Sequence, residues 1–157
     1  MFKYTTESEI HDFVLENFNN YFEFSLKANE FELSKGRIDF LGEDKETLYV
    51  IELKKDKIDK HAIKQLQKYI ETMQSDFPGR VIKGIVTAPE LISTLDISSL
   101  PSNIEVKILD DVYYNGKTRS LITLDDELKV ELEKIAKKQN RSFSNLVQTI
   151  LKDYLKK

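Results

Sequence analysis

Hydrophobic and polar positions along the chain follow two periods, one typical of helices and the other of strands. Apolar residues recur every three or four positions in residues 5–20 and 60–74, which predicts two amphipathic helices. Thr6 is the expected N-cap of the first helix, and Glu9, three residues later, is its capping-box partner. Shorter apolar runs bounded by turn residues predict strands at residues 22–33, 36–41, 47–54, 81–87 and 103–109.

The order of these elements predicts an α/β domain. Residues 47–54 are apolar on both faces, which is typical of a central strand covered on two sides. Pro89 is expected to open a further helix that ends by Ser99, and residues 110–117 are expected to form a polar connection. The sequence therefore predicts a mixed sheet flanked by helices, in the order αβββαβαβ.

The pattern changes from Thr118 onward. One short strand is expected at residues 119–124 and a helix at residues 125–139, and a second helix follows with Ser142 or Ser144 as its N-cap. A module of about forty residues cannot close a hydrophobic core alone. Because its strand has no partner within the module and its helices are apolar on one side, the module is expected to dimerise or dock.

Composition narrows the class of protein. The 157 residues are 40% hydrophobic and include no Cys, so neither a disulfide framework nor a thiolate zinc site is expected, and a reducing compartment is favoured. No apolar run approaches the ~20 residues that span a bilayer, and the N-terminus lacks the apolar core of a signal peptide. A cytoplasmic protein with no membrane partner is the expectation.

Charge is unevenly distributed between the two expected domains, residues 1–114 and 118–157. Residues 117–157 carry ten Lys and Arg against six Asp and Glu, a net charge of +4, whereas the rest of the chain carries 14 against 21, which is −7. A phosphate-binding surface needs local positive potential, and the tail supplies it. Nucleic acid is therefore a permitted partner.

Charged residues stand inside two of the predicted strands, among apolar neighbours. Asp39 lies in the strand at residues 36–41, and Glu52 and Lys54 end the strand at residues 47–54. Side chains alternate across a strand, so Glu52 and Lys54 share one face. These charges could simply be solvated, but unpaired charges are costly to bury in an apolar strand, and this favours a functional site.

Two carboxylates with an ammonium nearby suit a magnesium site for phosphodiester hydrolysis. Magnesium prefers oxygen ligands in near-octahedral geometry, and the expected ligands are Asp39, Glu52 and the backbone carbonyl of Leu53, with manganese as a substitute ion. The metal would lower the pKa of a bound water and offset charge in the transition state. Lys54 would orient or deprotonate that water, or stabilise the developing charge.

Gln65 and Tyr69 lie one turn apart on the second predicted helix, where they are expected to contact the site or the scissile phosphate. With the strand residues they resemble the PD-(D/E)XK nuclease superfamily, most closely its RecB-like and mismatch-endonuclease branches. The resemblance covers about residues 5–90 and implies a restriction-endonuclease-like αβββαβ core with a catalytic helical glutamate. The motifs that carry it are Glu7, Gly36-Arg37-Ile38-Asp39, Ile51-Glu52-Leu53-Lys54, and Gln65 with Tyr69.

Two positions of this resemblance involve a choice or a departure. Ile38 stands where the family's name has Pro, a substitution that is common in the superfamily. Glu7 is taken as the helical glutamate in preference to its neighbour Glu9, because Glu7 precedes Ile10 by three residues, as in the family pattern.

The tail is similar to ribbon-helix-helix repressors such as Arc and MetJ, which pair one strand from each of two chains into a ribbon that enters the major groove. The resemblance implies that Arg119, Leu121 and Thr123 point outward to read bases, although leucine departs from the polar pattern and would contact only a thymine methyl. Alternatively, the ribbon only dimerises, or the tail is a helical hairpin packed on the nuclease sheet. Free backbone N–H groups near the start of the last helix are expected to hold a phosphate, at Ser142, Ser144 and Asn145.

The sequence therefore predicts a magnesium-dependent DNA endonuclease that acts as a homodimer and is targeted by a ribbon-helix-helix module. The alternative is a DNA-binding transcriptional regulator whose nuclease-like domain is catalytically retired. The presence together of Asp39, Glu52 and Lys54 argues against that alternative. Action on RNA stays open.

Overall fold

The computed structural model describes residues 1–116 and 121–156. The chain divides into two compact units, residues 1–117 and 118–157, and each unit is described by itself. The first unit contains, in chain order, β1 (Phe2–Tyr4), α1 (Glu7–Glu16), α2 (Phe18–Tyr21), β2 (Ser25–Glu32), β3 (Arg37–Glu43), β4 (Thr47–Leu53), β5 (Lys57–Ile58), α3 (Lys60–Asp76), β6 (Val81–Ala88), β7 (Glu90–Leu91), the 3-10 helix η1 (Ile97–Ser99), β8 (Ile104–Ile108) and β9 (Val112–Tyr114).

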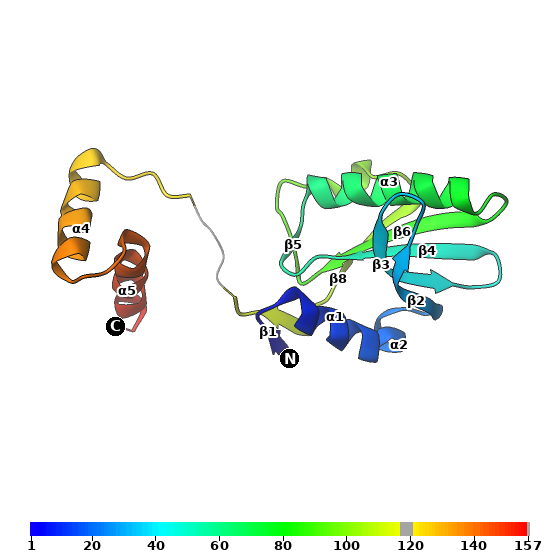
Figure 1. Ribbon diagram of the computed structural model, residues 1–157, viewed down its shortest axis with the longest axis horizontal. Coiled ribbons are helices and arrows are strands. Elements are labelled where there is room, and N and C mark those ends of the chain that lie inside the picture. The colour runs from blue at the N-terminus through cyan, green and yellow to red at the C-terminus, as the bar shows by residue number, and fades with distance from the viewer. Residues whose placement is uncertain (117–120, 157) are drawn as a thin grey trace. The chain divides into compact units, whose positions relative to one another are not determined.

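A five-stranded mixed sheet forms the centre of the first unit, which confirms the expected mixed α/β architecture (Figure 1). The strand order is β2-β3-β4-β6-β8, with antiparallel pairing from β2 to β4 and parallel pairing from β4 to β8. Every residue of β4 except Tyr49 is buried. The prediction of a central strand covered on both faces is therefore confirmed.

Helix α3 covers one face of this sheet, and α1 and α2 cover the other (Figure 1). On the α3 side, Val50 of β4 belongs to the same buried cluster as Leu66. On the opposite side, Ile51 belongs to a cluster with Val14 of α1. Because side chains alternate along β4, Glu52 continues the row of Val50 on the α3 side.

The first helix begins as the sequence predicts. The backbone N–H of Glu9 donates to the Thr6 hydroxyl at 3.2 Å, and the Thr6 N–H donates to Oε2 of Glu9 at 3.0 Å. This reciprocal capping box satisfies two backbone donors that a helix N-terminus otherwise leaves unpaired. Helix α3 is capped similarly, because the Asp59 carboxylate accepts a hydrogen bond from the N–H of Ala62 at 2.8 Å.

The helix expected to open at Pro89 is wrong. Residues Glu90–Leu91 instead form β7, paired in parallel with β5, and only Ile97–Ser99 form a single 3-10 turn. The Asp96 carboxylate accepts hydrogen bonds from the backbone N–H and the hydroxyl of Ser98. Such local side-chain bonds satisfy the backbone outside an α-helix and compete with helix formation.

The connection expected at residues 110–117 also contains a strand. Here β9 pairs in parallel with β1, and the Phe2 N–H donates to the Asp111 carbonyl at 2.8 Å. The Asn115 N–H continues the pairing to the carbonyl of Tyr4, also at 2.8 Å. Three-residue strands are too short to produce a recognisable alternation, so the sequence did not indicate this pair.

The second unit contains α4 (Asp126–Lys138) and α5 (Phe143–Leu155). Ser142 is the N-cap of α5, as one of the two expected candidates, and Ala136 and Leu146 are buried. None of the described helices of the chain is long and apolar enough to cross a membrane.

The strand expected at residues 119–124 is not found in its described part. Residues 121–125 have no regular secondary structure, and Arg119 lies outside the described residues. The physical reason is that a strand needs a backbone partner for its N–H and C=O groups, and the expected partner belonged to a second chain.

Candidate active site

Asp39 and Glu52 lie at the same end of the neighbouring strands β3 and β4. Phe40 is opposite Ile51 in the antiparallel register. Asp39 precedes Phe40 and Glu52 follows Ile51, so the two carboxyl-bearing residues lie next to each other across the pair of strands. The backbone N–H of Leu53 donates to Oδ2 of Asp39 at 2.7 Å. The backbone of β4 thereby fixes the Asp39 carboxylate beside Glu52.

A continuous chain of hydrogen bonds runs from β4 to α3. Nζ of Lys54 donates to Oε1 of Glu52 and to Oε1 of Gln65, both at 2.8 Å. Nε2 of Gln65 donates in turn to the Tyr69 hydroxyl at 3.0 Å. The expectation that Glu52 and Lys54 share a face is confirmed by this contact, and α3 brings its two expected residues to the same place.

Gly36 makes room for Tyr69, the last residue in this series of hydrogen bonds. Its φ angle is +98°, and a Cβ added there would lie 2.8 Å from Cε1 of Tyr69. A side chain at position 36 would therefore be strained in its backbone and would displace the ring. This glycine, directly before β3, allows the Tyr69 ring to lie directly against the backbone.

Burial opposes ionisation of both carboxyl groups. Only 4% of Glu52 is exposed, and burial, followed by the charge of Asp39, raises its pKa to about 7 against the opposing effect of Lys54. Burial also raises the pKa of Asp39, while the Leu53 N–H and the nearby His11 and Lys54 act to lower it. A cation bound between the two groups would favour the ionised form of both.

Helix α1 contributes a third carboxylate to the surroundings of this pair. The charge of Glu7 acts to raise the pKa of both Asp39 and Glu52. Glu9 is engaged elsewhere, because its Oε2 accepts the backbone N–H of Thr6 in the capping box. Of the two glutamates weighed from the sequence, Glu7 is the one within electrostatic reach of the site.

His11 also belongs to this region, and it is absent from the residues that the sequence pattern indicates. Its ring stacks on Phe40 with the ring centroids 4.6 Å apart, and its Nε2 atom is buried with no hydrogen-bond partner among the described residues. His11 follows Glu7 by four residues, so the two share one face of α1. That spacing is the signal by which sequence reasoning could have found it.

The donor set of the site is oxygen-rich but small. Within the described ranges, no three His, Cys, Asp or Glu side chains gather closely enough to hold a metal ion by themselves. Asp39 and Glu52 supply two adjacent carboxylates, and the carbonyl of Leu53 follows directly in the chain. Magnesium is usually bound through one or two carboxylates with several retained waters, so this set fits its chemistry.

The residues expected to bind DNA directly belong to the second unit. The Ser142 hydroxyl accepts the N–H of Asn145 at 3.2 Å, so one free donor of α5 is already used. The role of all these residues in DNA binding stays a prediction. The described members of this set are all exposed: Leu121, Thr123, Ser142, Ser144 and Asn145.

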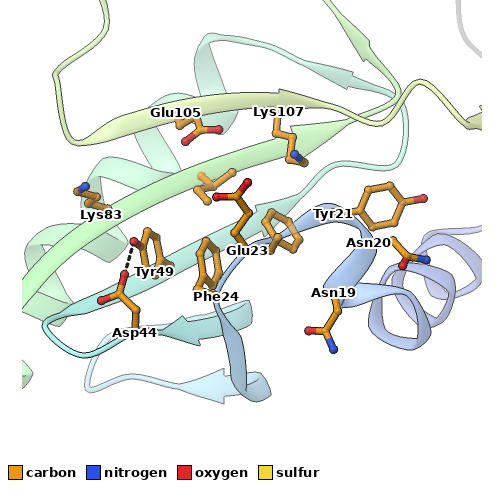
Figure 2. A pocket seen from close by; sticks show the side chains of 12 residues that line it. Asn19, Asn20, Tyr21, Glu23, Phe24, Asp44, Tyr49, Lys83, Glu105 and Lys107 are labelled. Carbon is orange, nitrogen blue, oxygen red and sulfur yellow. Dashed lines mark hydrogen bonds between the residues drawn. The ribbon is translucent and has the colours of Figure 1, made fainter.

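A separate hollow of about 720 Å³ lies on the sheet face that carries α1 and α2 (Figure 2). Phe24 and Tyr49 stack there with ring centroids 3.8 Å apart, and the Tyr49 hydroxyl donates to Asp44 at 2.6 Å. Neither Asp39 nor Glu52 lines this hollow. Its charged residues are of both signs: Glu23, Asp44, Lys83, Glu105 and Lys107.

Comparison with known proteins identifies the family. Residues 6–142 match the family described as the endonuclease NucS C-terminal domain. The chain belongs to this family. It is 30% identical over 132 residues to the endonuclease NucS of Methanocaldococcus jannaschii, a match that covers 78% of this chain and 50% of the relative. The match to the endonuclease NucS of Pyrococcus horikoshii is 34% over 88 residues, covering 55% of this chain and 34% of the relative.

Solved structures of similar proteins share the fold. A complex described as EndoMS with double-stranded DNA has a TM-score of 0.58 and 28% sequence identity, and the match covers 68% of this chain and 45% of that one. A repair endonuclease from Pyrococcus abyssi has a TM-score of 0.56 and 27% identity, with 68% and 47% covered. The chain therefore spans about half the length, or less, of the relatives that it matches.

Proposed function

We propose that the first unit is the catalytic part of a metal-dependent endonuclease that hydrolyses phosphodiester bonds in DNA. The observation that carries this proposal is the pair of adjacent carboxylates, the half-buried Asp39 and the buried Glu52, joined through Lys54 to polar side chains on α3. The chain also belongs to a family named for an endonuclease. More specifically, we propose that these residues form an active site of the PD-(D/E)XK type.

Asp39 and Glu52 are the proposed ligands of a magnesium ion, with the Leu53 carbonyl as a third and manganese as a substitute. The raised pKa of both carboxyl groups supports this assignment, because burial opposes their ionisation and a bound cation would favour the ionised forms. When bound, the ion supplies a water of lowered pKa and offsets negative charge on the phosphate.

Lys54 is proposed to contact the reacting phosphate or the attacking water. A lysine ammonium group has three N–H donors, and two of them are directed to Glu52 and Gln65. The ammonium group is thus fixed from two sides, and its third donor can stabilise the developing charge. Gln65 and Tyr69 act as the support on the helix side, and Glu7 adds negative charge beside the metal ligands.

Duplex DNA is the proposed substrate, because one of the similar solved structures is a complex with double-stranded DNA. A transcriptional regulator with a retired site is the second candidate. A regulator would have no use for the repulsion between Asp39 and the buried Glu52 that the fold maintains. Cleavage of RNA is an outcome that the same experiment would detect.

The second unit is proposed to form a homodimer. Leu121 is fully exposed, and Leu128 and Leu151 are about half exposed, so a single copy leaves much apolar surface in water. Pairing residues 119–124 of two copies would form the ribbon and cover part of this surface. Arg119, Leu121 and Thr123 would then face the DNA, and two active sites would be held together for cutting both strands.

The direct test is to incubate the purified protein with plasmid, linear, branched and single-stranded DNA, and with RNA. Each substrate is tested with magnesium, with manganese and with a chelator, and cleavage is measured. Asp39→Ala and Glu52→Ala are each expected to lower the rate by about 100-fold or more, and Lys54→Ala by about 100-fold. Glu105→Ala, in the hollow on the other sheet face, is the control and should cleave normally. Wild-type cleavage by Glu52→Ala would contradict the proposal.

A further inference from the structure

We infer that the solvent-exposed side of α3 binds the DNA backbone next to the scissile phosphate, through Lys64 and Lys68 together with Lys35. This inference rests on the proposed function and adds to it the surface that holds the substrate strand. Lysine ammonium groups bind phosphate oxygens in any sequence, so the contact would be independent of base identity.

The lysines of α3 form a row beside the active-site residues. Lys60, Lys64 and Lys68 are all exposed and recur every four residues, so neighbours along the row are about 6 Å apart on the helix axis. Gln65 and Tyr69 directly follow the last two of them in sequence and carry the hydrogen-bond chain from Lys54. The row of positive charge therefore runs alongside the residues that reach the candidate metal ligands.

Lys35 is brought to this row by a contact between distant segments. Ser34, in the turn between β2 and β3, donates its backbone N–H and its hydroxyl to the Asp76 carboxylate at 3.0 and 2.7 Å. Asp76 is the last residue of α3, so the turn is fastened to the helix end. A hollow of about 360 Å³ lies there, and its lining includes Lys35, Lys68 and Tyr69.

A second hollow of about 460 Å³ lies along the same side of α3. Its lining includes Lys64, Gln65 and Lys68, so Lys68 borders both hollows. Each hollow also contains one residue of the polar chain, Tyr69 in the first and Gln65 in the second. A strand lying in these hollows would be continuous with the active site.

The positive charges of Lys35, Lys64 and Lys68 are available to bind a ligand. None of Lys35, Lys64 and Lys68 takes part in an ion pair between described residues, whereas Lys27, Lys54 and Lys57 each pair with a glutamate. Glu71 is the acidic residue that lines both hollows. Among the residues that line the two hollows, three unpaired lysines therefore stand against the single carboxylate of Glu71, and the nearby Asp76 carboxylate is engaged by Ser34. The result is a local positive surface on a unit whose charge is otherwise negative, which fits a polyanion.

The test compares two double substitutions with the same change of charge. Lys64→Gln with Lys68→Gln removes the proposed contacts, and Lys83→Gln with Lys107→Gln removes two lysines from the hollow on the other sheet face (Figure 2). The chain of residues 1–157 is mixed with a labelled duplex in chelator, and the binding constant is measured over a series of salt concentrations. All four lysines are exposed or half-buried, so the fold should be retained, which circular dichroism would verify.

We expect the α3 pair to reduce the slope of log K against log salt concentration by about 1.8, since each lost phosphate contact contributes about 0.9. Adding Lys35→Gln should reduce it by about 0.9 more. The matched pair should leave the slope unchanged. An unchanged slope in the α3 pair, or equal losses in both pairs, would overturn the inference.

The same measurements separate this inference from the proposed function. If the wild-type chain neither binds nor cuts DNA, both are wrong. If the wild-type chain cuts DNA and Asp39→Ala abolishes cutting, while the α3 pair binds like wild type, then only the inferred surface is wrong.

Discussion

Burial and the charge of Asp39 both oppose ionisation of the Glu52 carboxyl group. Its pKa of about 7 in the folded chain lies above its ordinary value of 4.5, so at intermediate pH the folded state holds a proton that the unfolded chain has released. The stabilising effect of this proton is complete below pH 4.5. It is lost as the pH rises through about 7.

Glu52→Gln should remove this pH dependence while leaving an oxygen that accepts from Lys54. Without metal, we expect the free energy of unfolding of the wild-type chain to fall, relative to Glu52→Gln, by on the order of 3 kcal/mol between about pH 4 and pH 8. Urea titrations at a series of pH values would measure it. Glu16→Gln, an exposed change on α1, should follow wild type. Parallel curves for wild type and Glu52→Gln would show that burial does not oppose ionisation.

Replacing His11 should stabilise the folded chain. Its buried Nε2 has no partner among the described residues, and such an unsatisfied group costs about 1–3 kcal/mol. His11→Phe removes the polar atom and keeps a ring to stack on Phe40, so the melting temperature should rise by a few degrees. His61→Phe, on the exposed side of α3, is the control and should give no gain. A lower melting temperature for His11→Phe would mean that Nε2 binds a partner in solution.

At the scale of single elements, the turn before β3 is tied closely to α3. Gly36→Ala combines a strained positive φ with a contact on the Tyr69 ring, and Gly79→Ala has a similar φ of +87° but no atom within 4 Å of the added Cβ. Gly79→Ala should lower stability by about 1 kcal/mol. Gly36→Ala should lower it further and also slow cleavage, because displacing Tyr69 breaks its hydrogen bond with Gln65. Equal effects of the two changes in urea titrations and cleavage assays would refute this role of Gly36.

Sequence periodicity was sufficient for the long elements and insufficient for the short ones. The helices α1 and α3 and the strands β3, β4 and β6 each extend over enough residues for their period to be recognised. The pairs β1–β9 and β5–β7 involve strands of two or three residues, which are defined by their partners and not by their own pattern. The helix predicted after Pro89 is wrong, because the Asp96 carboxylate accepts the N–H of Ser98 in place of a helical hydrogen bond.

The site was predictable where local geometry decides it. Alternation along β4 placed Glu52 beside Lys54, and helical spacing placed Gln65 beside Tyr69. The burial of His11 and the bond from Ser34 to Asp76 were not predictable, because they depend on packing between segments distant in sequence. Sequence reasoning therefore found the residues of the candidate active site but not the surface beside it.

At the scale of the whole molecule, the second unit has too small a core for its apolar surface. Only Ala136 and Leu146 are buried hydrophobic residues among its described ones, while Leu121 and Leu155 are almost fully exposed. We expect light scattering to show a dimer for the full chain and a monomer for a chain ending at Asn115. If the chain of residues 1–157 is a monomer at micromolar concentration, the proposed pairing of two copies into a ribbon is wrong.

The pairing of β1 with β9 joins residues about 110 positions apart, and closing so long a loop is slow. The Tyr4 hydroxyl of β1 donates to the carbonyl of Lys55, directly after the candidate catalytic lysine, and α1 with Glu7 follows β1. During synthesis, β4 and α3 therefore leave the ribosome well before β9 can anchor the strand that supports them. A nascent chain is without this support until translation has reached the start of the second unit.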